Sequence, residues 1–174
     1  ASHASGPDYS RAFTIAHPDL PVPGHSGGFG EPTCQACHFD NDLNDPRGLF
    51  EVRGFPAAPI ADSTYHIEIL LSHPELVAAG FQVTVRTHDG RDAGVLESLD
   101  DRVTIVEHRG VTYAGHTMTG TTPSAGRESR WEVQWTPASD AESVLHAVGN
   151  AANGDRSEFG DFIYFSETKS AGKE

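Results

Sequence analysis

The residues best suited to chemistry form one short run, Cys34-Gln35-Ala36-Cys37-His38. Two cysteines separated by two residues and followed at once by a histidine are the pattern of a c-type haem attachment site. One turn of chain presents both thiols to the vinyl groups of one porphyrin, and His38 falls beneath the iron as the proximal ligand. The chain has two cysteines and this motif uses both. We therefore expect a single covalently attached haem c, held by Cys34, Cys37 and His38.

Other uses of the same residues fit less well. A structural zinc site requires four ligands, and no second Cys or His pair follows at matching spacing. A redox C-x-x-C of the thioredoxin type is expected beside a βαβ pattern, which the sequence lacks. A disulfide scaffold needs more bridges than two cysteines can form.

A six-coordinate haem needs a second axial ligand, generally His or Met. His116 and Met118, the single methionine, occur together in residues 111–118. If this stretch is an extended strand, both side chains point the same way, because side chains alternate along a strand. Bis-histidine ligation tends to give a lower potential than His/Met ligation. The alternatives are an open site or another histidine: His17, His25, His66, His73, His88, His108 or His146.

The elements that must position this motif have the period of β-strands. Apolar residues alternate in residues 64–72, 80–88, 103–106, 130–136, 143–148 and 162–165. Turn residues such as Asp89-Gly90 and Asn153-Gly154 separate these runs. The fold class predicted is an all-β, immunoglobulin-like antiparallel sandwich. One helical turn is expected at the motif, started by Pro32 and Thr33.

The predicted organisation has three parts. Residues 1–48, rich in Pro and Gly, form an irregular arm that carries the haem motif, and residues 39–48 are a solvated loop that departs from the EF-hand pattern. Residues 49–166 form the sandwich, one structural unit with the arm. Residues 167–174 form a polar tail.

Net charge and the length of the apolar runs exclude several classes of function. The 174 residues carry 12 basic and 25 acidic side chains, a net charge of −13. This charge argues against binding nucleic acid or an anionic membrane, and it suits either solubility or a basic redox partner. No apolar run reaches membrane-spanning length. A start at Ala1 is what removal of an export signal would leave, and haem is attached outside the cytoplasm, so we expect a periplasmic, extracellular or cell-surface protein.

Around the C-Q-A-C-H motif, the chain resembles bacterial exported proteins with a reeler-like domain, often described as choice-of-anchor proteins. The resemblance runs in order through residues 24–39, 80–83, 113–117, 131–137, 149–155 and 159–164. It implies an immunoglobulin-like sandwich, export and one covalent haem. It also places His116-Thr117 in the family pattern, which favours His116 over Met118 as the distal ligand. A soluble protein or a subunit of a larger assembly is expected.

The function predicted is a monohaem c-type cytochrome that carries single electrons outside the cytoplasm. Two alternatives stay open: a haem-based sensor with a free sixth position, and a structural or adhesive module in which haem fastens the arm. Asn150, Asn153, Asp155 and Asp161 are interpreted as turn-forming residues in preference to a cation site. The sequence indicates no catalytic residue, so an electron-transfer protein is favoured over an enzyme.

Overall fold

The structure, a computed structural model, describes residues 21–172. His17, most of the predicted arm before the motif and the end of the predicted tail fall outside the described residues.

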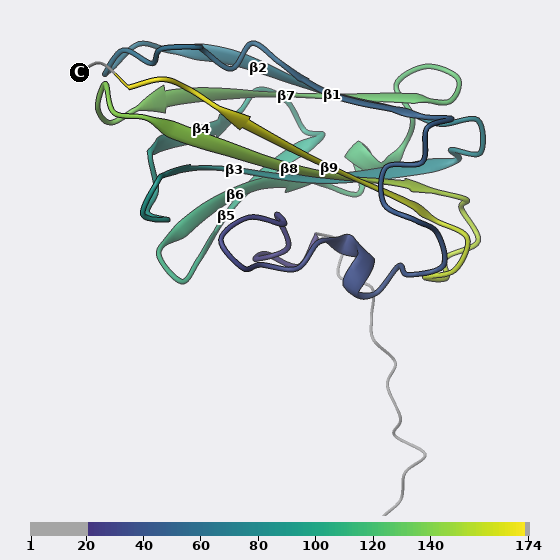
Figure 1. The fold of residues 1–174 in the computed structure, drawn as a ribbon. Helices are drawn as coiled ribbons and strands as arrows, with labels where there is room; N and C mark the ends of the chain where they lie inside the picture. Colours follow the sequence, from purple (N-terminus) through teal and green to yellow (C-terminus); the bar gives the residue numbers. More distant parts are fainter. Residues whose placement is uncertain (1–20, 173–174) are drawn as a thin grey trace, which may run out of the picture.

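Two antiparallel sheets face each other (Figure 1). The first has the strand order β1-β2-β7-β4 and the second has the order β5-β6-β3-β8-β9. The strands are β1 (Leu49–Arg53), β2 (Tyr65–Ser72), β3 (Ala78–Thr87), β4 (Gly94–Ser98), β5 (Val103–His108), β6 (Val111–His116), β7 (Glu128–Pro137), β8 (Ser143–Ala152) and β9 (Phe162–Lys169). Two short 3-10 helices, η2 (Cys34–Ala36) and η3 (Thr119–Thr121), lie outside the sheets.

The core lies between the sheets, as the alternation in the sequence predicts. Trp131, Val133 and Trp135 of β7 have no exposed surface, and they point inward because every second side chain of a strand faces the same way. From the opposite sheet, Phe81 lies 4.7 Å from Trp131 between ring centroids. The predicted all-β antiparallel sandwich is confirmed.

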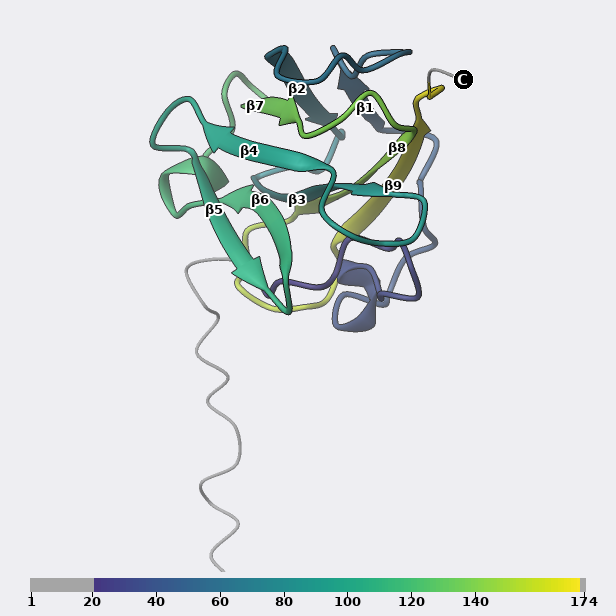
Figure 2. The ribbon, with the colours of Figure 1, turned by 90° about the vertical axis from the view of Figure 1, so that its left-hand side faces the viewer.

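The arm crosses the outer face of the second sheet, so that this sheet is covered on both sides (Figures 1 and 2). A Cβ atom on Gly28 would lie 2.1 Å from Nδ1 of His146 in β8, and one on Gly115 would lie 2.4 Å from Pro21. The arm therefore approaches the sheet at a distance that these glycines make possible.

Several element boundaries differ from the sequence prediction. β1 and β4 are short edge strands with little apolar alternation, and the pattern analysis did not detect them. β9 continues to Lys169, so residues 167–169 belong to the sheet and the predicted tail boundary is wrong. The ladder with β8 continues to the Val144–Lys169 pair, and within it Glu167 lies 2.8 Å from Nε2 of His146, its opposite residue.

Among residues 21–172, none of the helices has the length and apolar character needed to span a bilayer.

Candidate functional site

The motif folds as the single turn that its sequence predicts. Thr33 caps η2 by accepting a hydrogen bond from the Gln35 amide at 3.2 Å. The amides of Cys37 and His38 then donate to the Cys34 carbonyl at 3.2 and 3.0 Å. Cys34, Cys37 and His38 therefore emerge from one compact turn, next to β8 and the loop between β8 and β9.

The two thiols do not resemble those of a dithiol enzyme. Cys34 and Cys37 are not joined by a disulfide, and Cys37 is exposed. Burial raises the pKa of the Cys34 thiol to about 12. Attacking thiols of C-x-x-C enzymes have lowered pKa values instead. Within residues 21–172 no three His, Cys, Asp or Glu side chains are grouped so that they could hold a metal ion, so the zinc alternative finds no further ligands there.

His38 has one ring nitrogen beside a buried carboxylate. Nδ1 lies 2.7 Å from Oδ2 of Asp161, whose side chain is only 2% exposed. The two atoms are not aligned as a hydrogen bond, so Nδ1 is a buried polar atom without such a partner. Nε2 makes no hydrogen bond within the described chain. A histidine that binds a metal through Nε2 needs an acceptor at Nδ1, and Asp161 stands at that place. The residues present therefore fit an axial haem ligand at His38.

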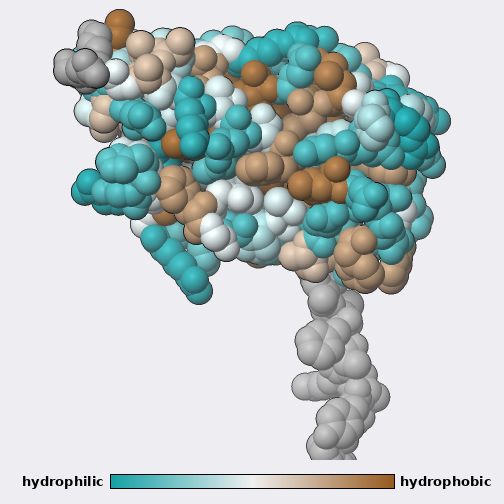
Figure 3. Space-filling model, in the orientation of Figure 1, coloured by the Kyte–Doolittle hydropathy of each residue, from teal (hydrophilic) through white to brown (hydrophobic). Residues whose placement is uncertain are grey.

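Apolar surface adjoins the motif. Phe39 follows His38 directly and is 62% exposed, and Phe159 is 52% exposed. Their rings meet edge to face at 5.8 Å. Figure 3 shows brown and tan surface at its lower right, where the segment after the motif and the β8–β9 loop lie in Figure 1. Large exposed apolar side chains beside a covalent attachment motif suit contact with a porphyrin.

The loop between β8 and β9 contains turns at Asn153 and Asp155, as predicted, whereas the prediction for Asn150 is wrong because that residue lies within β8. The side chain of Asn153 accepts from the Asp155 amide at 3.0 Å, and that of Asp155 accepts from the Ser157 amide at 2.8 Å. Both are Asx turns. The loop thereby places Asp161 next to His38.

His116 is the last residue of β6, and its ring lies over the backbone of Gly80 and Phe81. Its Nδ1 lies 3.0 Å from the Phe81 amide nitrogen and 3.3 Å from the Phe81 carbonyl oxygen, so one tautomer accepts from the amide and the other donates to the carbonyl. Burial lowers the pKa of His116, which favours the neutral ring. Binding iron through Nε2 requires the tautomer in which Nδ1 donates to the Phe81 carbonyl. His116 as distal ligand stays a prediction.

The two predicted axial histidines border the same end of the second sheet. Gly80, against which the His116 ring lies, pairs with Asn150 of β8. The side-chain amide of Asn150 lies 3.4 Å from Oδ2 of Asp161, the carboxylate beside His38. His116 and His38 are therefore linked through a short chain of neighbours.

Met118 lies outside the strand, so the premise that residues 111–118 form one extended segment is wrong. β6 ends at His116, and Met118 has helical backbone angles (φ −55°, ψ −44°) directly before η3. Met118 is 60% exposed.

The remaining described histidines divide by position. His88 and His108 lie at the far ends of β3 and β5, and His66 is on the first sheet. His146 is buried beneath the arm, and His25 lies within it. His73 is buried and stacks on Phe162 with ring centroids 4.0 Å apart.

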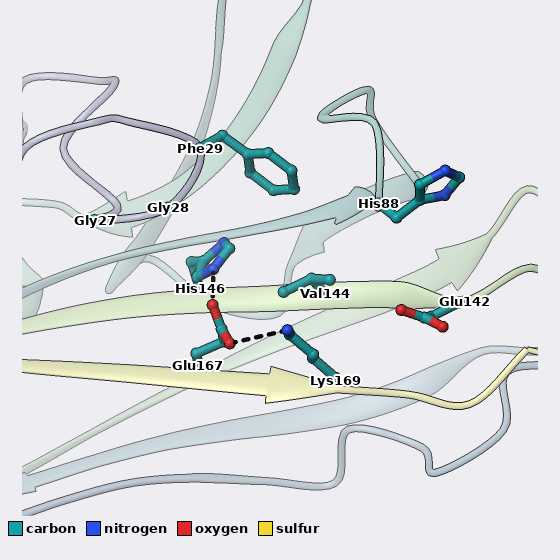
Figure 4. A pocket seen from close by; sticks show the side chains of 9 residues that line it. All are labelled: Gly27, Gly28, Phe29, His88, Glu142, Val144, His146, Glu167 and Lys169. Carbon is teal, nitrogen blue, oxygen red and sulfur yellow. Dashed lines mark hydrogen bonds and ion pairs between the residues drawn. The ribbon is translucent and has the colours of Figure 1, made fainter.

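A surface pocket of about 260 Å³ lies where the arm meets β8 and β9 (Figure 4). Three of its lining side chains contact one another: His146 contacts Glu167, which in turn lies 3.5 Å from Lys169. The motif residues do not line it. The pocket lies along the contact between the arm and the sheet. Its volume is below the ~300 Å³ at which the range of small-molecule sites begins.

Sequence reasoning missed two residues that organise this region. Asp161 was interpreted as a turn former, and its contact with His38 joins positions far apart in the chain. Glu31, three residues before the motif, accepts hydrogen bonds from Arg86 and Tyr113. A lone carboxylate gives no spacing signal, so neither contact can be found without the fold.

Neither protein-family models nor curated proteins match this sequence. Among solved structures, the chain is similar to the human F-spondin reeler domain, with a TM-score of 0.51 and 16% identity over 76% of this chain and 95% of that one. A second structure, the Reelin-N domain of F-spondin, gives a TM-score of 0.50 and 18% identity over 80% and 97%. The chain therefore has a reeler-like fold. At this identity the likeness concerns the fold alone.

Proposed function

We propose that this protein is a monohaem c-type cytochrome that carries single electrons outside the cytoplasm. The observation that carries the proposal is the C-x-x-C-H turn, with His38 set beside the buried carboxylate of Asp161 and Nε2 without a hydrogen bond to residues 21–172. Bound haem would supply a one-electron iron couple. Export, a basic redox partner and membership of a larger assembly belong to the same proposal, and the net charge of −13 supports a basic partner.

The chain's own residues have separate tasks in this proposal. Cys34 and Cys37 would hold the porphyrin covalently, and His38 would bind iron from one side. Phe39 and Phe159 would cover apolar porphyrin surface. The arm fixes the motif against the sheet, because Glu31 is tied to Arg86 and Tyr113 just ahead of Cys34.

The first experiment is expression with an export signal in a bacterium that attaches haem c, followed by absorption spectra of the ferric and ferrous protein. The pyridine adduct distinguishes thioether-linked haem from haem with free vinyl groups. Cys34→Ser or Cys37→Ser should leave one vinyl group free and shift the adduct band. His66→Ala, on the first sheet, is the control and should leave the spectrum unchanged. A wild-type protein without haem bands would refute the proposal.

The distal ligand is tested by His116→Ala. If His116 occupies the sixth position, the variant becomes high-spin or accepts an external ligand, and the wild type lacks the near-infrared methionine–iron band. An unchanged low-spin spectrum would remove His116 from the site, and a methionine band would assign the position to Met118.

A haem-based sensor is the first alternative, and one of the two hydrogen bonds open to His116 favours it. In the tautomer whose Nδ1 accepts from the Phe81 amide, Nε2 carries a proton and is not available to iron. Rapid binding of carbon monoxide to the reduced wild type would support an open site, whereas a failure to bind would support electron transfer.

A structural or adhesive module is the second alternative, and the reeler-like fold favours it. In that case haem would mainly fasten the arm. A Cys34→Ser/Cys37→Ser protein that folds, resists proteolysis and keeps its partner would make any redox role secondary.

A further inference from the structure

We infer that Asp161 is a positioning residue for the axial histidine: its carboxylate fixes the Nδ1 side of His38 and directs Nε2 toward the iron. This inference rests on the proposed haem function and adds a residue that the C-x-x-C-H motif does not contain. Its basis is the 2.7 Å approach between Asp161 Oδ2 and His38 Nδ1.

The carboxylate is held from both sides. Its Oδ1 accepts a hydrogen bond from the Asn153 amide at 3.1 Å, and its Oδ2 lies 3.4 Å from the Asn150 side-chain amide. The Asp161 backbone carbonyl accepts from the Asn41 side chain at 3.0 Å, on the segment that follows the motif. The loop that carries Asp161 is thus tied to the segment that carries His38.

No arginine or lysine among residues 21–172 pairs with this carboxylate, and His38 is the one ring that it meets at ion-pair distance. A nearly buried carboxylate with neutral donors needs a further donor to offset its desolvation. Nδ1 of His38 is the matching group, because it is a buried nitrogen without an aligned hydrogen bond. The carboxylate, which has neutral donors only, and the unpaired ring nitrogen complement each other.

The chemical consequence concerns the tautomer. A histidine that binds iron through Nε2 carries its proton on Nδ1, and an acceptor there fixes the ring and makes Nε2 a more basic ligand. A more basic ligand and a nearby negative charge stabilise the ferric form over the ferrous form. Asp161 should therefore lower the reduction potential.

A purely structural role for Asp161 predicts a different outcome. If the carboxylate only closes the β8–β9 loop through the Asn153 amide, its replacement lowers stability without a specific change at the iron. The potential and the ring proton of His38 separate these two roles.

The test uses haem-loaded protein and the variant Asp161→Asn, which keeps the shape and removes the charge. Loss of an outer-shell partner of a metal ligand changes metal affinity or activity about 10–100-fold, and we expect the low end of that range, about tenfold, as an increase in the equilibrium constant for reduction. A tenfold increase equals a positive shift of ~59 mV for one electron. Asp155→Asn is the matched control, because it removes a carboxylate from the same loop without a contact to His38. Equal potentials in the two variants would overturn the inference.

If Asp161→Asn does not fold, the wild type supplies the answer. In the reduced low-spin protein, NMR should resolve the Nδ1 proton of His38 and show slow exchange with solvent. Rapid exchange would mean that Nδ1 has no protein acceptor and would overturn the inference. Failure of the proposed function is distinguishable, since a protein without haem bands has no such potential or resonance to measure.

Discussion

The outer faces of the two sheets differ in what covers them. The outer face of the first sheet carries a network of exposed ion pairs, such as Glu68 with Arg53 and Arg130 at 3.5 and 3.3 Å. The second sheet is covered by the arm, and its central strands bury polar side chains such as Gln82, Thr84 and His146. Arg86, only 4% exposed, pairs with Glu31 of the arm. A glutamate–arginine pair is therefore exposed on the first sheet. On the second sheet such a pair holds the arm in place, next to the C-x-x-C-H motif.

The largest expected effect comes from Glu31→Gln, which leaves the guanidinium of Arg86 buried without its countercharge. Breaking a buried pair costs about 3–5 kcal/mol, and we expect the lower end because the Glu31 side chain is 16% exposed. Urea unfolding measures the loss, and limited proteolysis should show earlier cleavage in the arm. A loss no greater than that of Glu68→Gln would mean that the arm is not fastened by this pair.

A smaller effect is expected from Tyr113→Phe. The Tyr113 hydroxyl donates to the Glu31 carboxylate beneath the arm, and hydrogen bonds to charged groups contribute about 1.5–3 kcal/mol. Tyr65→Phe is the control on the first sheet, where the hydroxyl only accepts from the Ile60 amide at 3.0 Å. That change should cost about 0.5–1.5 kcal/mol in the free energy of unfolding. Equal losses would contradict a special role for the arm contact.

The contrast between the sheets also explains what the sequence could and could not predict. β7 has one face that is not covered by the core, so apolar and polar residues alternate along it. Its core residues Trp131, Val133 and Trp135 can therefore be recognised in the sequence. β3 and β8 are buried almost throughout, because the arm covers polar residues such as Gln82 and His146 on the face away from the core. The local haem motif and its single turn were predictable from neighbouring residues. Partners such as Asp161 depend on how distant segments fold together.

Acid should weaken the arm contact specifically. Burial alone would raise the pKa of Glu31, but hydrogen bonds from Ser26, Tyr113 and Arg86 lower it below 4.5 overall. A carboxyl with a lowered pKa in the folded state contributes stability above its unfolded pKa and loses it as pH falls through the folded value. The difference in unfolding free energy between wild type and Glu31→Gln should therefore shrink as the pH falls below 4.5, the ordinary pKa of this group.

Carboxylates shared by both proteins, such as Asp45 and Asp89, whose pKa values are lowered to about 2 by hydrogen bonds, cancel in that difference. A gap that stays constant as the pH falls would show that Glu31 does not titrate with the arm contact.

The smallest effect is expected on the open sheet, from Glu68→Gln. Its two arginine partners are about half exposed, so each can rotate toward water when the carboxylate is removed. Exposed pairs contribute about 0–1 kcal/mol, and salt screens what remains. Urea unfolding at low and high ionic strength should give a small difference that fades with salt, whereas the loss in Glu31→Gln should persist. If salt removed the losses in Glu68→Gln and Glu31→Gln equally, the Glu31–Arg86 pair would be as exposed to solvent as the ion pairs on the first sheet. The outer faces of the two sheets would then not differ in the way that their burial implies.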